Sequence, residues 1–443
     1  MALGGSGGER DISNEQSDGS GGYRGYVLTL LSLVYLFNFV DRQIFSVLLE
    51  SIKREFHFSD TQLGLLGGIA FGFFYATVGL PLARLADRCN RRNLIAISLA
   101  LWSGMTALCG QASGFATLFL TRMGVGVGEA GGMPPSYSLI SDYFPPRRRG
   151  FALAVFNLGI PFGVMTGFLL GGWINQLYGW RSAFLAVGLP GVALSILVAS
   201  TLREPRRGRY DEQAAQGELP SIRSTALFLW ERPACRHLCL AASLYGLAAW
   251  GAGVWQPSFF IRVHGMSSGV AGTWLALVFG LSGACGAMLG GTLADRLAQK
   301  TGDYRWYPWI SAAGVVISIP FVFLVYLWPA PIPALLFLSV PTIFGHMYLG
   351  PTMAMLLGIA GARRRAVASA IYAFVLNLVS MGAGPLIVGW SSDHLQARYG
   401  AEGLRYSILL LVVSATVWAA VHFVLAARTL REDLMSAADA ERG

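Results

Sequence analysis

TRMGVGVGEA, residues 121–130, lies inside an apolar segment that runs from Phe115 to Ser141. Such a segment is long enough to cross a bilayer, which takes about 20 residues. Arg122 and Glu129 are costly there, because insertion scales assign an ionisable group at the membrane centre roughly 2.5–3.5 kcal/mol. Their seven-residue spacing puts both on one helix face, roughly 10 Å apart along the axis. We therefore expect them to face water, a partner or a substrate.

Three glycines in this stretch, Gly124, Gly126 and Gly128, leave the rest of the helix surface without side chains. A neighbouring helix can therefore approach closely. A buried structural ion pair that holds two helices together is the alternative interpretation of Arg122 and Glu129.

The composition indicates a polytopic membrane protein. The 443 residues are 54% hydrophobic and only 13% charged, whereas soluble proteins average about 25% charged. The net charge of +9 does not indicate nucleic-acid binding, because the arginines fall in short loops beside apolar runs. The five cysteines show neither a disulfide framework nor metal-ligand spacing, so no metal or cofactor is expected.

Hydropathy predicts about twelve membrane spans in an all-α membrane protein. Their expected ranges are 26–50, 62–84, 94–112, 115–141, 150–175, 182–201, 236–262, 269–297, 307–328, 333–361, 365–393 and 404–428. Basic residues gather in one alternating set of loops, which predicts that both termini are cytoplasmic. Lys53, Arg54, Arg262, Arg398 and Arg405 are the exceptions on the outer side.

The spans divide six and six around a polar linker, residues 202–234, which is expected to carry a short surface helix near 224–231. We expect a flexible N-terminal tail (1–22), two helical bundles (23–201 and 235–430) and a C-terminal tail (431–443). The Gly/Ser-rich N-terminus has no apolar core typical of a signal peptide.

The two halves look like repeats. ARLADR (83–88) follows the second span and GTLADR (291–296) follows the eighth, while RGFALA (149–154) and RAVASA (365–370) open the fifth and eleventh. Parallel six-helix repeats are one way to build an alternating-access transporter, with its site between the repeats near the midplane.

ARLADRCNRR (83–92) resembles the cytoplasmic signature Gly-x-Leu-Ala-Asp-Arg-x-Gly-Arg-Arg of the major facilitator superfamily, with Ala83 and Asn90 in place of two glycines. Arg122 and Gly126 match its Arg-x-x-x-Gly pattern, and residues 159–172 match its glycine-rich fifth helix. The resemblance implies twelve transmembrane helices in two six-helix bundles related by a pseudo-two-fold axis.

NFVDR (38–42), DRCNRR (87–92) and TRMGVGVGEA (121–130), in this order, look like the spinster family. Animal members export sphingosine-1-phosphate or lysophospholipids, and bacterial members are described as proton-coupled. The resemblance implies a bacterial inner-membrane transporter of a lysolipid, a sphingolipid-like molecule or another amphipathic anion.

Asp41, Arg42 and Glu129 are expected to meet near the bilayer centre, because each lies roughly 20 Å from an end of its span. Burial favours a neutral carboxyl and a nearby arginine favours a charged one, so the two effects can balance near physiological pH. We expect Glu129 and Asp41 to carry the proton. Arg42 would compensate a carboxylate or hold an anionic headgroup. A static Asp–Arg pair is the alternative.

Two gates are expected. Asp60 and Arg122 could pair across the outer entrance, although the sequence Ser59 to Gln62 is also typical of a plain helix cap. The expected cytoplasmic gate consists of Asp87, Arg88, Arg91 and Asp295, although simple topology charge is the better interpretation of Arg91.

A cavity for an amphipathic substrate needs an apolar wall and polar groups. The expected substrate-binding residues, each also open to a plain packing role, are Arg42, Asn38, Asn157, Tyr245, Trp255, His346, Tyr372 and Asn377.

Other functions stay open. A proton symporter of small organic acids would use Arg42 for a carboxylate. A non-transporting membrane sensor or a lipid-modifying enzyme would belong to a different class, but the sequence has no paired-histidine metal motif, nucleophile elbow or Walker loop. We therefore expect no enzyme activity, and a monomer that uses protons, an amphipathic anion and the bilayer as partners.

Overall fold

The computed structural model describes residues 21–210 and 221–442. The expected N-terminal tail, residues 1–22, lies almost wholly outside the described residues, as do ten residues of the linker. The described part of the chain is helical and contains no strand.

Between residues 21 and 201, the N-terminal half contains nine helices that form six passes. They are α2 (Gly21–Phe56), α3 (Asp60–Gly67), α4 (Ile69–Ala86), α5 (Arg91–Cys109), α6 (Phe115–Glu129), α7 (Met133–Tyr143), α8 (Pro146–Asn157), α9 (Gly159–Tyr178) and α10 (Trp180–Thr201).

The C-terminal half follows a short linker helix at the position where the sequence predicts one. Its elements are α11 (Ile222–Glu231, the linker helix), α12 (Pro233–Arg262), α13 (Ser268–Thr301), α14 (Trp306–Leu327), α15 (Pro331–His346), α16 (Leu349–Asn377), the π-helical turn η1 (Leu378–Ala383), α17 (Gly384–Tyr399), η2 (Gly400–Glu402) and α18 (Gly403–Arg442).

Twelve membrane passes are consistent with these helices. By length and composition, ten stretches in the described residues could span a membrane. The longest of them, Arg363–Ala437, contains α17 and most of α18, and the pass at 115–143 is broken into α6 and α7 by a turn. Gly361, with a φ of 67°, makes the bend inside α16 that separates the tenth pass from the eleventh. The final helix continues to Arg442, past the expected end of the last bundle at 430.

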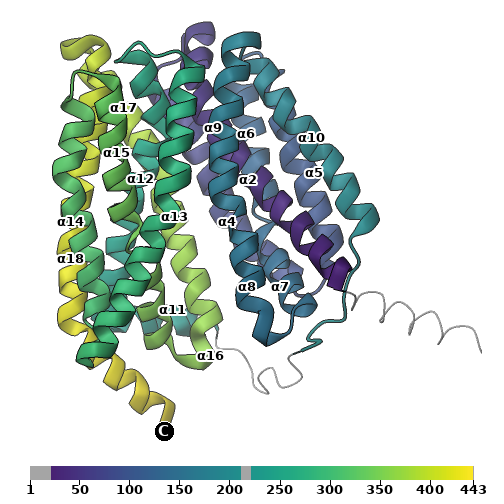
Figure 1. The fold of residues 1–443 in the computed structure, drawn as a ribbon, viewed down its shortest axis with the longest axis vertical. Helices are drawn as coiled ribbons and strands as arrows, with labels where there is room; N and C mark the ends of the chain where they lie inside the picture. Colours follow the sequence, from purple (N-terminus) through teal and green to yellow (C-terminus); the bar gives the residue numbers. More distant parts are fainter. Residues whose placement is uncertain (1–20, 211–220, 443) are drawn as a thin grey trace, which may run out of the picture.

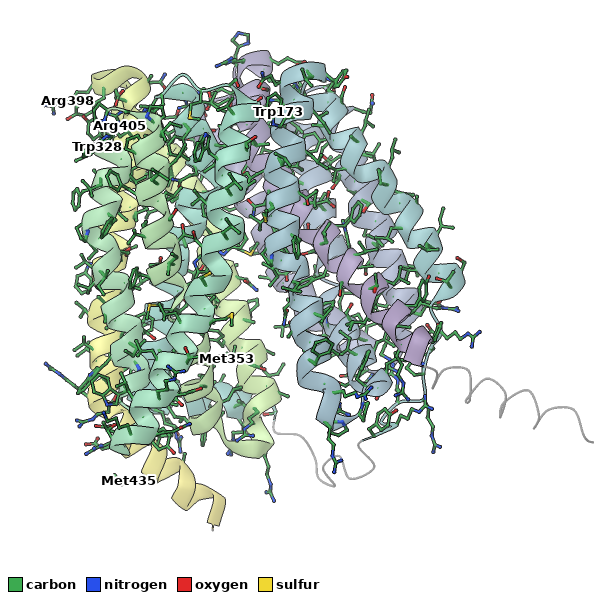
Figure 2. The ribbon with its side chains drawn as sticks, in the orientation of Figure 1. Trp173, Trp328, Met353, Arg398, Arg405 and Met435 are labelled. Carbon is green, nitrogen blue, oxygen red and sulfur yellow. The ribbon has the colours of Figure 1, made fainter. Side chains whose placement is uncertain are left out.

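The two halves meet most closely at the end of the bundle opposite the C-terminus (Figure 1). There Trp173, labelled in Figure 2, donates its indole N–H to Thr273 Oγ1 at 3.0 Å, and the rings of Phe168 and Phe279 stack with centroids 5.7 Å apart. The described N-terminal end of α2 and the C-terminal end of α18 lie at the other end of the bundle (Figure 1).

Close helix contacts explain the glycines of the opening stretch. A Cβ added at Gly126 would lie 2.5 Å from the Phe71 carbonyl oxygen of α4, and one at Gly128 would lie 2.7 Å from the Trp102 nitrogen of α5. These contacts pack α6 directly against two neighbouring backbones. They set the position of Arg122 and Glu129 inside the N-terminal bundle.

Candidate functional site

A buried ion pair joins α2 to the end of α6 inside the N-terminal half. Arg42 Nε donates to Glu129 Oε2 at 2.7 Å, and the two side chains are 8% and 0% exposed. Glu129 is the last residue of α6, where the chain turns before α7. An ion pair in a low-dielectric environment interacts strongly, but it must offset the cost of removing both charges from water.

Aromatic rings surround the Arg42 guanidinium. Its carbon lies 4.6 Å from the centroid of Tyr75, 5.1 Å from Phe39 and 5.3 Å from Phe71. Such cation–π contacts stabilise a positive charge that has lost part of its hydration. The guanidinium is therefore held beside Glu129 by rings as well as by a carboxylate.

Asp41, next in sequence to Arg42, is buried without a hydrogen-bond partner. Its side chain is 1% exposed, and neither carboxylate oxygen has a partner in the described structure. Trp102 Nε1 and Thr106 Oγ1, which face Asp41, also lack partners. Buried polar groups are nearly always bonded, so an unbonded carboxyl group in a transmembrane bundle marks Asp41 as a candidate functional residue.

Arg122 completes what we call the central cluster, which consists of Asp41, Arg42, Arg122 and Glu129. Its guanidinium carbon lies 4.3 Å from the centroid of Phe45 and 5.0 Å from that of Phe71, and its Nε has no hydrogen-bond partner. The expected pairing of Arg122 with Asp60 is therefore wrong in this structure. The physical reason is that Arg122 packs against aromatic faces in the interior, whereas Asp60 forms ion pairs with Lys53 and Arg262.

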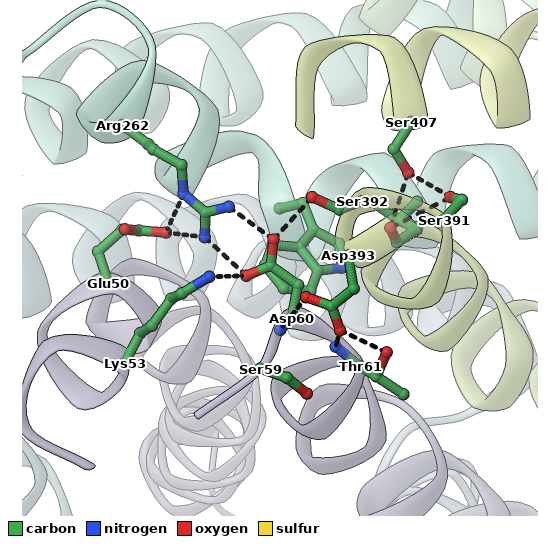
Figure 3. Close-up of polar contacts among 12 residues, drawn as sticks. Glu50, Lys53, Ser59, Asp60, Thr61, Arg262, Ser391, Ser392, Asp393 and Ser407 are labelled. Carbon is green, nitrogen blue, oxygen red and sulfur yellow. Dashed lines mark hydrogen bonds and ion pairs between the residues drawn. The ribbon is translucent and has the colours of Figure 1, made fainter. Parts of the chain in front are cut away.

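A second set of charges, which we call the cross-half network, joins the two halves at the end opposite the termini (Figure 3). Arg262 of α12 donates from Nη1 to Asp60 Oδ2 and from Nη2 to Glu50 Oε1, each at 2.6 Å. Lys53 Nζ lies 2.5 Å from Asp60 Oδ1, and Ser392 Oγ donates to Asp60 Oδ2 at 2.6 Å. Asp60 therefore receives bonds from both halves.

Asp393 of α17 completes the cross-half network from the opposite direction. It accepts from the backbone N–H of Asp60 at 2.9 Å and from the N–H and hydroxyl of Thr61 at 2.8 Å and 2.6 Å (Figure 3). A carboxylate at a helix N-terminus satisfies backbone donors and complements the helix dipole. The cap-like sequence does cap α3, but through a box made by Ser59 and Gln62, which leaves the Asp60 side chain to face the other half.

Sequence reasoning missed Glu50, Lys53, Arg262 and Asp393 as site residues. A signal was present, because Lys53 and Arg262 are basic residues on the side of the bundle that is otherwise poor in them. Charges that break a topology rule need a partner, and here the partners are Asp60 and Glu50.

The expected substrate-binding residues of the N-terminal half lie near the central cluster. Asn38 lines a small pocket together with Tyr75 and Glu129. Asn157 of α8 accepts a hydrogen bond of 3.2 Å from Tyr137.

In the C-terminal half, most of the residues expected at the substrate site are buried, and Asn377 is partly exposed. Tyr245 and Tyr372 are largely buried, and His346 Nδ1 lies 2.5 Å from the Thr342 carbonyl oxygen. Asn377, partly exposed, ends α16 at the π-helical turn η1. Trp255 is fully buried and donates to the Pro385 carbonyl oxygen at 2.9 Å, so in the described structure it packs within its own half.

The expected cytoplasmic gate residues make their described bonds within one half. Arg91 donates to Asp142 and, at 2.6 Å, to Glu204, which fastens α5 to the start of the linker. Arg91 is buried in its own half in the described structure, and its place in a gate stays a prediction. Asp87 accepts from Arg207 through its backbone oxygen, Arg88 is exposed, and Asp295 accepts from Tyr307 at 2.7 Å.

Comparison with known proteins identifies a family that this chain resembles. The family model described as Major Facilitator Superfamily matches residues 31–385. An MFS-type efflux pump of Mycolicibacterium smegmatis is 33% identical over 428 residues, which is 96% of this chain and 98% of that protein. A sphingosine-1-phosphate transporter of Danio rerio is 25% identical over 418 residues, or 86% of this chain and 80% of that protein.

A solved structure is also similar over almost the whole chain. It is a bacterial homologue of the human lysosomal transporter spinster, in an inward-facing and unoccupied conformation. The TM-score is 0.84 and the sequences are 30% identical, with 94% of this chain and 99% of that one covered.

Proposed function

We propose, on the premise that the chain belongs to the Major Facilitator Superfamily, that it couples the movement of protons to that of an amphipathic, anionic, lipid-like substrate by alternating access. The chain is a spinster-like transporter of the MFS type and an integral membrane protein, and its relatives are transporters rather than enzymes. The finer assignments are the proposal: proton coupling, the substrate class, the bacterial inner membrane and a monomeric state.

The observation that carries the proposal is the central cluster, in which Glu129 binds Arg42 beside an unpartnered Asp41. Protonation of Glu129 would remove the negative charge that Arg42 pairs with. The guanidinium could then bind a phosphate or carboxylate, for which its planar fork is well suited. The anion and the deprotonated Glu129 would thus compete for one arginine, so protonation of Glu129 would favour anion binding and couple the two movements.

The cross-half network supports alternating access, because its bonds can form only when the halves meet at that end. Basic loops predict that the termini are cytoplasmic, so this end would be the outer one. The described state would then be closed to the outside. The similarity to a homologue in an inward-facing conformation supports this orientation.

Lipid-like cargo is supported by the relatives and by the aromatic surroundings of Arg42. One relative is described as a sphingosine-1-phosphate transporter. Phe39, Phe71 and Tyr75 provide apolar surface beside the cation, as a phosphate head attached to an alkyl chain requires. The gate residues proposed for the outer side are Asp60, Arg262 and Asp393.

Flux measurements on purified protein in proteoliposomes test the proposal. A lysophospholipid should move across the membrane faster when a pH gradient is imposed, and a proton-conducting uncoupler should remove the difference. A neutral monoacylglycerol of the same chain length is the matched control, since it lacks the anion for Arg42. Transport of a small sugar acid without any lysophospholipid flux would instead favour the small-anion symporter.

A further inference from the structure

An apolar groove on the outside of the C-terminal half lies away from both charge clusters. It runs between α14 and α18, and Arg428 closes one end. The other lining residues are Val316, Ile319, Val417, Ala420, Val421, Val424 and Leu425. The four valines are between 40% and 49% exposed, so the groove is open to the lipid that surrounds the bundle.

The length of the groove matches one leaflet of a bilayer. Val417, Val421, Val424 and Arg428 follow one another at helical spacing and therefore form a single stripe on α18. Val417 and Arg428 are eleven positions apart, which corresponds to about 16 Å of helix. Half of a hydrocarbon core of roughly 30 Å is about 15 Å. An extended acyl chain can therefore lie along the stripe with its head at Arg428.

The end of the groove at Arg428 carries excess positive charge. Arg428 is exposed, and in the described structure it forms no hydrogen bond or ion pair. One turn further, Arg431 lies 3.3 Å from Asp303, a carboxylate that already binds Arg305 at 2.7 Å. Glu432 is also exposed there and makes no described ion pair. Asp303 is thus shared by Arg305 and Arg431, and Arg428 is left without a partner.

A tryptophan marks the depth of the lipid headgroups at the same end. Trp309 precedes Val316 by seven residues, so both lie on the same face of α14. Its side chain is 38% exposed, and the Arg305 guanidinium lies 5.3 Å from its ring centroid. Tryptophan is enriched at membrane interfaces, where one end of its ring is apolar and the other polar. The arginines therefore lie where phosphates of the bilayer would be.

We propose that this groove binds one acyl chain of an anionic phospholipid from the leaflet at the termini end, with Arg428 on its phosphate. A guanidinium binds phosphate through two parallel hydrogen bonds. A headgroup with a net negative charge is favoured over a zwitterionic one, because an added ammonium group would face three arginines. The site is independent of the transported substrate, since α14 and α18 lie outside the central cluster.

Native mass spectrometry of the purified full chain tests the site with two lipids of identical chains, phosphatidylglycerol and phosphatidylcholine. The wild type should retain more phosphatidylglycerol. Arg428→Ala should weaken that binding roughly fivefold, the effect of one basic residue near an anionic surface, and change phosphatidylcholine little. Arg148→Ala, which alters an exposed arginine of the other half, is the matched control and should change neither.

Filling the groove provides a second variant. Val421→Trp should reduce the binding of both lipids, because it occupies the space of the acyl chain while Arg428 remains. Wild-type retention of phosphatidylglycerol by Arg428→Ala would overturn the proposal, whatever Val421→Trp does. Unchanged retention of both lipids by a folded Val421→Trp would overturn it as well.

Discussion

The central cluster and the cross-half network are both buried groups of opposite charge, but they are bonded to very different degrees. Asp60 in the cross-half network accepts from Arg262, Lys53 and Ser392. Asp41 in the central cluster has no hydrogen-bond partner. The fully bonded set joins the two halves, whereas the incompletely bonded set lies within one half.

This difference suggests different tasks. A buried ion pair that is broken on one side leaves an uncompensated charge, so the cross-half network strongly favours the state in which it forms. An unbonded carboxyl group gains little from staying charged and can take up a proton at low cost in contacts. The first arrangement suits a gate, and the second suits a proton carrier.

The largest effect is expected from Arg262→Ala in the cross-half network. Asp60 and Glu50 would both lose a buried cation, and removal of one partner of a buried pair costs about 3–5 kcal/mol. The population should shift toward a state open at this end. The distance between spin labels at positions 57 and 397, measured by electron paramagnetic resonance, should increase. Arg181→Ala is the control, because its pair with Glu55 is exposed and worth roughly 0–1 kcal/mol.

A smaller effect on stability should distinguish the two carboxylates of the central cluster, Glu129 and Asp41. Glu129→Gln should lower the stability by about 2 kcal/mol, since it removes the charged acceptor of Arg42. Asp41→Asn should lower the stability less, because neither Asp41 oxygen accepts a bond of standard geometry and asparagine keeps an oxygen toward Trp102 and Thr106. Apparent melting temperatures in one detergent provide the comparison. Equal losses in the two variants would mean that Asp41 is bonded in a way that the structure does not describe.

Asp393→Ala should weaken the contact between α17 and α3 by about 1 kcal/mol, the usual value of a helix cap. Asp393→Asn keeps an acceptor oxygen and should lose less. Labelling of a cysteine placed at Ser59 measures opening of this end. Faster labelling in the alanine variant than in the asparagine variant is expected, and identical rates would show that the cap does not hold the halves together.

The smallest effect concerns pH outside the membrane-spanning segments. The Arg305 guanidinium lowers the pKa of Asp303, in the turn between α13 and α14, to about 2. A carboxyl group whose pKa is lowered by folding stabilises the fold above its unfolded value, near 3.9. That stabilisation is lost as the pH falls from about 4 to about 2. Asp303→Asn should remove this acid sensitivity and change the melting temperature little at pH 7, since such pairs are worth at most about 1 kcal/mol.

The fold was predictable because membrane spans leave long apolar runs, and because glycines such as Gly126 and Gly128 mark close helix contacts. Arg42 and Glu129 could be brought together from depth alone, and the structure does place them in contact. Their roles in proton and substrate binding stay predictions.

The error at Asp60 has a physical reason. Depth along a helix says which residues share a level, but it does not say which way each helix turns. Arg122 and Asp60 belong to the same end of the N-terminal half, yet Arg122 faces Phe45 and Asp60 faces Arg262 of the other half. Contacts between halves depend on the conformational state, which no local pattern in the sequence encodes.

The most direct test of the account measures proton coupling in proteoliposomes that contain Glu129→Gln. The variant should still exchange labelled for unlabelled substrate across the membrane, because alternating access does not require the proton in that assay. It should fail to accumulate or expel substrate in response to a pH gradient. Gradient-driven transport at the wild-type level would contradict the assignment of Glu129 as the proton carrier.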